Sequence, residues 1–210
     1  MPIQILLADD HAIVRDGLRA ILEREGFRVV AEAADGKEAL DWARKLHPDI
    51  AVLDVSMPVL NGFDSAREIQ RISPTTKTIL LTVHKEQQYI LEGLRSGAKG
   101  FVIKTHAAKE LVHAIREAAR GGTYFSPEVA QAAVEAYQMK NDLPLDPLSS
   151  RERQVLQLIA EAKTTKEIAA FLGISVKTAE TYRTRIMEKL DVHETASLVR
   201  YAIRRGMVQP

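Results

Sequence analysis

Two different periodicities divide the chain. Over the first 121 residues, short apolar runs alternate with longer segments in which apolar positions recur at helical spacing. The runs are rich in Val, Ile and Leu and lack strict apolar–polar alternation, as is typical of parallel strands covered on both faces. They are Ile3–Ala8, Phe27–Ala33, Ile50–Leu53, Thr78–Thr82 and Gly100–Ile103. The helical segments lie near residues 11–25, 36–46, 62–72, 86–96 and 107–120.

Five strands alternating with five helices predict an α/β fold with a doubly wound, five-stranded parallel sheet. A length of 210 residues accommodates this domain and a second, smaller one, since domains average about 150 residues. In a doubly wound sheet, ligands bind at the carboxyl ends of the strands. Residues with candidate chemistry are therefore expected just after the apolar runs.

The segment after the last of these helices is rich in Gly and Pro and carries an acidic excess. We predict a domain of residues 1–122, a linker of residues 123–146 and a second domain of residues 147–210. Good helix formers indicate that a helix occupies part of Pro127–Met139. Asn141–Pro144 is predicted to be a loop.

The pattern after the linker is purely helical. Capping-box sequences of the form Ser/Thr-x-x-Glu begin at Ser149 and Thr164, each ahead of apolar residues at helical spacing. Ser175 can cap a third helix, and a fourth is expected over residues 194–205. The second domain is thus predicted to be a small, all-α, four-helix domain.

Composition and charge exclude several classes of protein. Because the chain has no cysteine, a disulfide framework, a cysteine nucleophile and cysteine-ligated zinc or iron–sulfur clusters are excluded. No apolar run reaches the roughly 18 residues of a membrane span, and the N-terminal run ends in Asp9-Asp10, unlike a signal peptide. We expect a soluble, cytoplasmic protein with no membrane partner. Residues 148–210 carry a net charge of +4 against zero for residues 1–122, a weak indication of a polyanionic partner.

Five polar residues end four of the predicted strands. Asp9 and Asp10 follow the first strand and Asp54 ends the third, so three carboxylates meet at one edge. They repel one another unless a cation is bound, and an all-oxygen set suits Mg²⁺. Thr82 and Lys104 add a hydroxyl and an ammonium. One such aspartate alone is usually a cap or turn residue, but the whole set fits phosphoryl transfer to Asp54.

The residues around this set resemble the receiver domain of bacterial response regulators. The resemblance covers about 120 residues and rests on Ala8-Asp9-Asp10-His11, Asp54-Val55-Ser56-Met57-Pro58, Asn61-Gly62, Thr82 and Gly100-Phe101-Val102-Ile103-Lys104. It implies a flavodoxin-like sheet with strand order 2-1-3-4-5. It also implies that Asp54 is the phosphoacceptor.

The same resemblance implies roles for the other residues of the set. Asp10, Asp54 and the backbone carbonyl of Ser56 would bind Mg²⁺, with Asp9 acting through water. Thr82 and Lys104 would contact the phosphoryl group. Phe101 occupies the place of an aromatic switch residue that swings inward, although an ordinary core residue at a strand edge fits the sequence as well.

The second and third helices of the C-terminal domain have helix-turn-helix form, with a tight turn through Gly173-Ile174-Ser175. A face of the third helix carries the polar residues Lys177, Thr178, Glu180, Thr181, Arg183, Thr184 and Arg185. Such side chains bind phosphates and base edges in DNA, but a helical bundle with a solvated charged face is the alternative.

Residues 148–208 resemble the LuxR-type DNA-binding domain. The resemblance rests on three segments, Leu148–Leu156, Lys166–Ala169 and Leu172–Tyr182. The resemblance implies that base edges are contacted by Glu180, Thr181 and Thr184. It assigns phosphates mostly to Lys177, Thr178, Arg183 and Arg185. Leu198, Tyr201 and Ala202 would form a dimerisation surface, while core packing explains the same three residues equally well.

Together, the two resemblances imply a two-component response regulator of the NarL/FixJ type. A histidine kinase would phosphorylate Asp54 with Mg²⁺ bound, and phosphorylation would control homodimerisation and sequence-specific binding to double-stranded promoter DNA. RNA polymerase is a further candidate partner. The chain would not be an enzyme in the usual sense, because it would catalyse only its own phosphorylation from a donor and its own dephosphorylation.

Three alternatives remain at this point. A Mg²⁺-dependent phosphatase with an aspartyl intermediate normally has a second acid two residues after the nucleophile, where this chain has Ser56. A protein-binding regulator would not use the basic residues of the third helix. A phosphorylation-independent regulator would leave the acidic set without a function.

Overall fold

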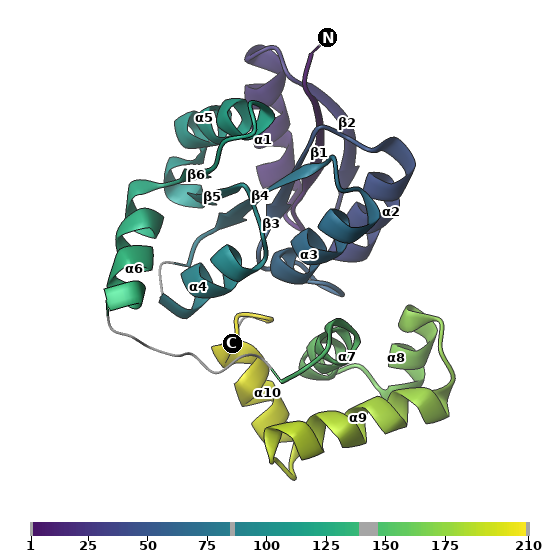
Figure 1. Ribbon diagram of the computed structural model, residues 1–210. Coiled ribbons are helices and arrows are strands. Elements are labelled where there is room, and N and C mark those ends of the chain that lie inside the picture. Colours follow the sequence, from purple (N-terminus) through teal and green to yellow (C-terminus); the bar gives the residue numbers. More distant parts are fainter. Residues whose placement is uncertain (1, 85–86, 139–146, 209–210) are drawn as a thin grey trace. The chain divides into compact units, whose positions relative to one another are not determined.

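Six parallel strands form one sheet in the computed structural model, which describes residues 2–84, 87–138 and 147–208 (Figure 1). The strand order is β2-β1-β3-β4-β5-β6, which contains the predicted order 2-1-3-4-5. The strands are β1 Gln4–Ala8, β2 Arg28–Ala33, β3 Ile50–Asp54, β4 Lys77–Thr82, β5 Gly100–Ile103 and β6 Tyr124–Phe125.

The prediction of a five-stranded sheet was therefore wrong by one strand. Tyr124 and Phe125 pair in parallel with Gly100 and Phe101 at the edge of the sheet. Phe125 packs against the apolar core on one face of the sheet and Tyr124 against the core on the other. A two-residue strand is too short to produce a recognisable sequence periodicity, so only the pairing with β5 reveals it.

Helices cover both faces of the sheet. On one face lie α1 and α5, and on the other lie α2, α3 and α4, with α6 packed against α4 (Figure 1). The helices are α1 Ala12–Arg24, α2 Gly36–Leu46, α3 Gly62–Ile72, α4 Gln87–Arg95, α5 Ala107–Ala119 and α6 Pro127–Gln138. The expected helix within Pro127–Met139 is thus present as α6, and Met139 itself lies outside the described residues.

Alternate residues of each inner strand enter different cores. In β1, Ile5 and Leu7 pack on the α1–α5 side, whereas Leu6 and Ala8 pack on the α2–α4 side, and all four are fully buried. A strand buried on both faces has no position for a polar side chain. The polar residues of the sheet therefore gather where the strands end.

The connection from β3 to α3 brings a helix close to the end of a central strand. Asn61 caps α3 by accepting a hydrogen bond from the backbone N–H of Asp64 at 2.9 Å. A Cβ atom on Gly62 would lie only 2.2 Å from the backbone oxygen of Asp54. Glycine at position 62 therefore permits α3 to begin directly beside the end of β3.

The chain forms two compact units, Met1–Asn141 (the sheet unit) and Asp142–Pro210 (the helical unit). The helical unit contains α7 Ser150–Ala160, α8 Thr165–Leu172, α9 Val176–Leu190 and α10 Thr195–Arg204. Within this unit, α7 packs against α9 and α10, and α8 packs against α9.

The predicted helix starts in this unit are confirmed. Ser149 and Thr164 each form a complete capping box with the glutamate three residues later. Ser175 caps α9 by accepting a hydrogen bond from the backbone N–H of Thr178 at 3.1 Å. The predicted loop at Asn141–Pro144 lies outside the described residues. Among the helices that the structure describes, none combines the length and apolar character needed to cross a bilayer.

Candidate functional site

The carboxyl ends of four strands bring polar side chains to one edge of the sheet. Asp54 and Thr82 are the last residues of β3 and β4, while Asp9 and Lys104 directly follow β1 and β5. Asp9, Asp54 and Thr82 are almost completely buried, and the Lys104 side chain is 15% exposed. Four of the residues selected from the sequence thus lie at the carboxyl ends of four neighbouring strands, at one edge of the sheet.

Lys104 bridges two carboxylates at this edge. Its ammonium Nζ lies 2.7 Å from Oδ2 of Asp9 and 2.9 Å from Oδ1 of Asp54. Charge-assisted contacts of this length are among the stronger polar interactions in proteins. The lysine therefore holds the side chains of Asp9 and Asp54 together and partly compensates their buried charge.

The electrostatics of Asp54 reflect this crowding. Burial raises the pKa of the Asp54 carboxyl above its usual value, and the nearby carboxylates of Asp9 and Asp10 act in the same direction, against the opposing Lys104 ammonium. Burial alone would lower the pKa of Lys104, but the charges and hydrogen bonds of Asp54 and Asp9 raise it. The ammonium form of the lysine is therefore favoured, while an ionised Asp54 needs further positive charge.

A divalent cation fits this set of donors. Four residues each offer one potential ligand atom here, and these atoms all lie within 4.8 Å of one another. They are carboxylate oxygens of Asp9, Asp10 and Asp54 and an imidazole nitrogen of His11. The Asp10 side chain is 33% exposed, which leaves the group open to solvent on one side. Hard oxygen donors around a partly open position suit Mg²⁺, which keeps several water ligands. Ser56, the other residue assigned to the metal, is half-buried in the loop after β3.

Arg15 is a residue of this edge that our sequence reasoning missed. From the first turn of α1, its guanidinium donates a hydrogen bond to the backbone carbonyl of Asp9 at 2.6 Å and lies 3.5 Å from the carboxylate of Glu32 on β2. It therefore ties the loop after β1 to the neighbouring strand. The apolar spacing of α1 identifies the helix but gives no signal for this contact.

The predicted switch residue Phe101 points into the interior. Its ring is fully buried and meets the ring of Phe63 edge-on, with the centroids 6.4 Å apart. A Cβ atom placed on Gly93 of α4 would lie 2.3 Å from Cε1 of this ring. The inward ring position therefore depends on a glycine at position 93, a contact that the sequence pattern did not reveal.

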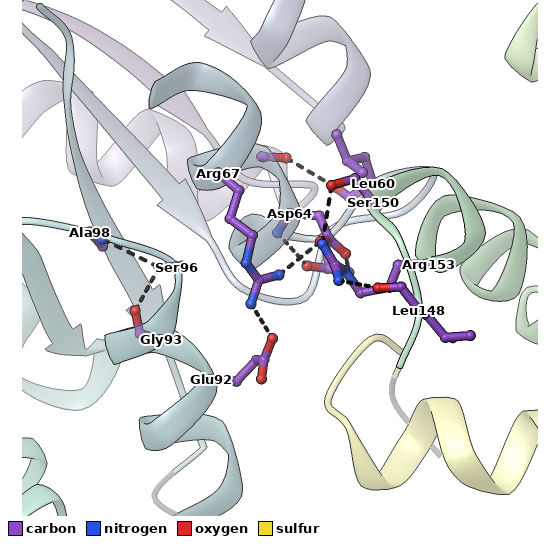
Figure 2. A network of polar contacts seen from close by, with 12 residues as sticks. Leu60, Asp64, Arg67, Glu92, Gly93, Ser96, Ala98, Leu148, Ser150 and Arg153 are labelled. Carbon is purple, nitrogen blue, oxygen red and sulfur yellow. Dashed lines mark hydrogen bonds and ion pairs between the residues drawn. The ribbon is translucent and has the colours of Figure 1, made fainter. Parts of the chain in front are cut away.

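A polar network joins α3 to α4 (Figure 2). The Arg67 guanidinium lies between the carboxylates of Asp64, at 2.8 Å, and Glu92. Within the turn after α4, the Ser96 hydroxyl donates to the backbone carbonyl of Gly93 at 2.6 Å. The position of α4, which carries the glycine facing Phe101, is thus fixed by both ion pairing and packing.

The residues predicted to contact DNA share one helix, α9, whose apolar side is marked by the buried Ala179 and Ile186. Six of the seven are exposed and Arg183 is half-buried. Four of them, Lys177, Thr178, Thr181 and Arg183, also make contacts within the helical unit. The Thr181 hydroxyl donates to the backbone carbonyl of Lys177 at 2.9 Å, and Arg183 donates to the Thr195 hydroxyl at 2.6 Å. The structure thus leaves most of this polar face accessible.

The three residues assigned to dimerisation lie on α10 but differ in accessibility. Leu198 and Ala202 are fully buried, and α10 packs against α7. Tyr201 is half-buried and lies beneath the guanidinium of Arg205, which is 5.3 Å from the ring centroid. Of the three side chains, Tyr201 is the one with accessible surface for a partner.

Comparison with known families assigns both units. Residues 5–116 match the response regulator receiver domain, and residues 146–202 match the LuxR family of bacterial regulatory proteins. The chain belongs to the two-component response regulators. It is one with a receiver and a LuxR-type DNA-binding domain, as the motifs of both regions indicated.

Curated relatives of this response regulator match over nearly their whole length. It is 38% identical over 209 residues to the response regulator GacA of Pseudomonas aeruginosa, covering 98% of each chain. It is 38% identical to the response regulator UvrY of Escherichia coli K12, covering 98% of this chain and 95% of UvrY. These relatives place the response regulator among transcriptional regulators rather than conventional enzymes.

Solved structures of RcsB are also similar to this response regulator. An RcsB–DNA complex matches with a TM-score of 0.62 and 28% identity, covering 97% of this chain and 99% of RcsB. RcsB of Salmonella enterica serovar Typhimurium, bound to the promoter P1flhDC in the presence of the phosphomimetic BeF₃⁻, matches with the same TM-score over 96% of this chain. The likeness thus spans both units.

Proposed function

We propose that phosphorylation of Asp54 by a histidine kinase controls sequence-specific binding of this response regulator to promoter DNA. The observation that carries the proposal is the Lys104 bridge. Its ammonium lies 2.7 Å from the carboxylate of Asp9 and 2.9 Å from that of Asp54. Phosphoryl transfer needs a nucleophile, here Asp54, with a positive charge beside it, here Lys104. The accessible polar face of α9 is the proposed DNA-binding surface that phosphorylation regulates.

In the proposed transfer, a carboxylate oxygen of Asp54 bonds to phosphorus as the bond from phosphorus to the donor nitrogen breaks, and the departing imidazole takes up a proton. Asp10, Asp54 and the Ser56 carbonyl would hold Mg²⁺, with Asp9 contributing through water. Bound Mg²⁺ supplies positive charge for the phosphoryl oxygens. Attack of water on the acyl phosphate would return Asp54 and inorganic phosphate, so the protein catalyses only its own modification and its reversal.

Lys104 and Thr82 are the proposed sensors of the phosphoryl group. Lys104 would exchange part of its contact with Asp54 for the added dianion, and the Thr82 hydroxyl would donate a hydrogen bond to it. In the structure, this hydroxyl accepts a hydrogen bond from the backbone N–H of His84 at 3.0 Å. Movement of Thr82 toward the phosphoryl group would therefore pull on the start of the β4–α4 connection, and Phe101 would follow.

The proposed output is a DNA-bound homodimer. Two α9 helices entering successive major grooves would contact inverted half-sites about 34 Å apart. Glu180, Thr181 and Thr184 are proposed to face base edges, and Lys177, Thr178, Arg183 and Arg185 to contact phosphates. Tyr201 is the accessible member of the proposed dimerisation residues, with Leu198 and Ala202 packing beneath it.

Family and neighbours support this proposal. The RcsB neighbours are described as bound to DNA and, in one structure, as two dimers on two parallel DNAs. A receiver implies a histidine kinase as donor, and promoter binding makes RNA polymerase a candidate partner. With these partners, the proposed site of activity is the bacterial cytoplasm. The proposed domains are a receiver of residues 1–122, a linker of residues 123–146 and a DNA-binding domain of residues 147–210.

The decisive experiment selects bound fragments from the genomic DNA of the source organism with and without acetyl phosphate and Mg²⁺, at fixed physiological salt. We expect enrichment of inverted half-sites with the wild type only when the phosphodonor is present. Asp54→Asn should show no donor-dependent enrichment, whereas the exposed control Asp41→Asn should behave as the wild type. Equal enrichment with and without donor would instead identify a phosphorylation-independent regulator.

A further inference from the structure

His11 turns its imidazole toward the carboxylates of the cation site. Its Nδ1 lies 2.7 Å from Oδ1 of Asp10 and 3.4 Å from Oδ1 of Asp9. The ring is not used to cap α1, although His11 occupies the N-cap position. Its backbone N–H instead donates to Oδ1 of Asp9 at 2.9 Å. The imidazole therefore adds a nitrogen donor to a site that otherwise consists of oxygens.

The two carboxylate oxygens of Asp9 contact different residues. Oδ2 contacts the ammonium of Lys104, whereas Oδ1 faces the backbone and ring of His11. Lys104 thus occupies the buried side of the carboxylate group, and the histidine lies on its outer side, with a side chain that is 65% exposed.

The spacing of these atoms suits a shared metal ion. Two ligand atoms bound to one octahedral ion at about 2.1 Å lie about 3 Å apart. The distances from Nδ1 to the two aspartate oxygens, 2.7 Å and 3.4 Å, bracket this value. Small rotations of the His11 and Asp10 side chains, which are 65% and 33% exposed, would bring Nδ1 and both oxygens onto one ion.

The chemistry of the donor determines which ion gains from it. Mg²⁺ prefers oxygen ligands, whereas imidazole nitrogen suits Ni²⁺, Zn²⁺ and other first-row transition metals. We propose that His11 is a metal-selectivity residue whose imidazole ligates a divalent transition-metal ion in the receiver site and raises the preference for that ion over Mg²⁺, relative to a site of oxygen donors alone. The inference rests on the cation site of the proposed function and assigns a further ligand to it.

The test compares Ni²⁺ and Mg²⁺ affinities of the full chain, purified without a histidine tag. Equilibrium dialysis measures Ni²⁺ binding, and amide shifts in NMR spectra measure Mg²⁺ binding. We expect His11→Gln to weaken Ni²⁺ binding by about tenfold or more while changing Mg²⁺ binding by less than about twofold. Exposed His193 in the helical unit provides a matched control, and His193→Gln should leave both affinities unchanged.

Two further variants place the ion. Asp9→Asn and Asp10→Asn should each weaken Ni²⁺ and Mg²⁺ together, because both ions use these carboxylates. With Co²⁺ as a spectroscopic probe, the visible absorption of the wild type should change on the His11→Gln substitution, since nitrogen is replaced in the coordination shell. This spectrum reports the ligand directly and does not depend on phosphorylation.

Either of two results would overturn the proposal. Unchanged Ni²⁺ affinity in His11→Gln would mean that the imidazole is no ligand, and an equal loss for both ions would mean that it only orients Asp10. Neither outcome depends on DNA binding. Conversely, if DNA binding did not depend on the phosphodonor, the proposed function would fail. The ratio of Ni²⁺ affinity to Mg²⁺ affinity could still be compared between the wild type and His11→Gln.

Discussion

Two buried carboxylates, one in each unit, have opposite electrostatic situations. The Asp54 side chain in the sheet unit is 5% exposed and that of Glu152 in the helical unit is 4% exposed. Burial, Asp9 and Asp10 raise the pKa of Asp54 against the effect of Lys104. Burial would also raise the pKa of Glu152, but hydrogen bonds from Lys189 and Ser149 lower it instead.

The difference lies in what surrounds each carboxylate. Glu152 accepts hydrogen bonds from the backbone and hydroxyl of Ser149 at 2.7 Å and 2.8 Å and from Lys189 at 2.7 Å. Asp54 shares one ammonium with Asp9. A fully satisfied buried charge stabilises a fold, whereas an incompletely compensated one is ready to bind a cation or accept a phosphoryl group. Removal of Lys104 or of Lys189 tests this contrast directly.

The largest effect is expected at the Lys104 ammonium. Lys104→Met should lower the rate of Asp54 phosphorylation by acetyl phosphate by about 100-fold, because a charge that stabilises the phosphoryl oxygens is lost. Time courses on phosphate-affinity gels measure this rate. The exposed Lys109→Met on α5 is the control and should keep the wild-type rate. A rate for Lys104→Met within about twofold of the wild type would contradict the assigned role.

The packing around the switch residue gives the next effect. Gly93→Ala should lower the free energy of unfolding by about 1–3 kcal/mol, because the new methyl group overlaps the buried Phe101 ring. Gly17→Ala on α1 has open space at the new Cβ and should raise the same free energy by about 0.5–1 kcal/mol. Urea unfolding followed through Trp42 compares the two variants. An unchanged or higher value for Gly93→Ala would show that the ring has another low-energy position.

A smaller effect is expected at Glu152. Lys189→Met should destabilise the helical unit by about 1 kcal/mol at pH 7, a modest value because the lysine side chain is 42% exposed and solvent screens the pair. Hydrogen exchange of α7 amides in the full chain measures this difference. The exposed Lys166→Met is the matched control.

The pH dependence of that difference has a definite sign. Because folding lowers the pKa of Glu152, its stabilisation is complete above the unfolded value of about 4.3 and is lost as pH falls through the lower folded value. The difference between wild type and Lys189→Met should therefore persist from pH 7 down to about pH 4.3 and shrink below it. A difference that grows on acidification would contradict the pairing.

The smallest effect concerns the exposed surface of α9. Lys177→Ala should weaken DNA binding a few-fold across different sequences and reduce the slope of log affinity against log salt by about one, as expected for one lost phosphate contact. Binding titrations at several salt concentrations provide the slope. Loss of affinity confined to one base pair would assign Lys177 to base recognition instead.

Much of the fold followed from local pattern. The apolar runs identified β1, β3, β4 and β5, which are almost wholly buried, and also the half-buried strand β2. Ser149 and Thr164 identified helix starts because a capping box involves residues only three apart. β6 was missed because two residues give no periodicity. Asp9, Asp54 and Lys104 were expected to lie close together because parallel strands end at the same edge, and their side chains are in contact in the structure.

The sequence by itself determined which family the chain belongs to and which strand ends carry acidic residues and the lysine, since both depend on residue type and spacing. Only the tertiary structure decided how these residues contact one another. Lys104 and Asp9 are 95 positions apart, and their 2.7 Å contact exists because the parallel sheet brings the carboxyl ends of β1 and β5 to the same edge, although β3 and β4 lie between these strands. The inward Phe101 ring likewise depends on packing against Phe63 of α3 and Gly93 of α4, which periodicity along the chain does not encode.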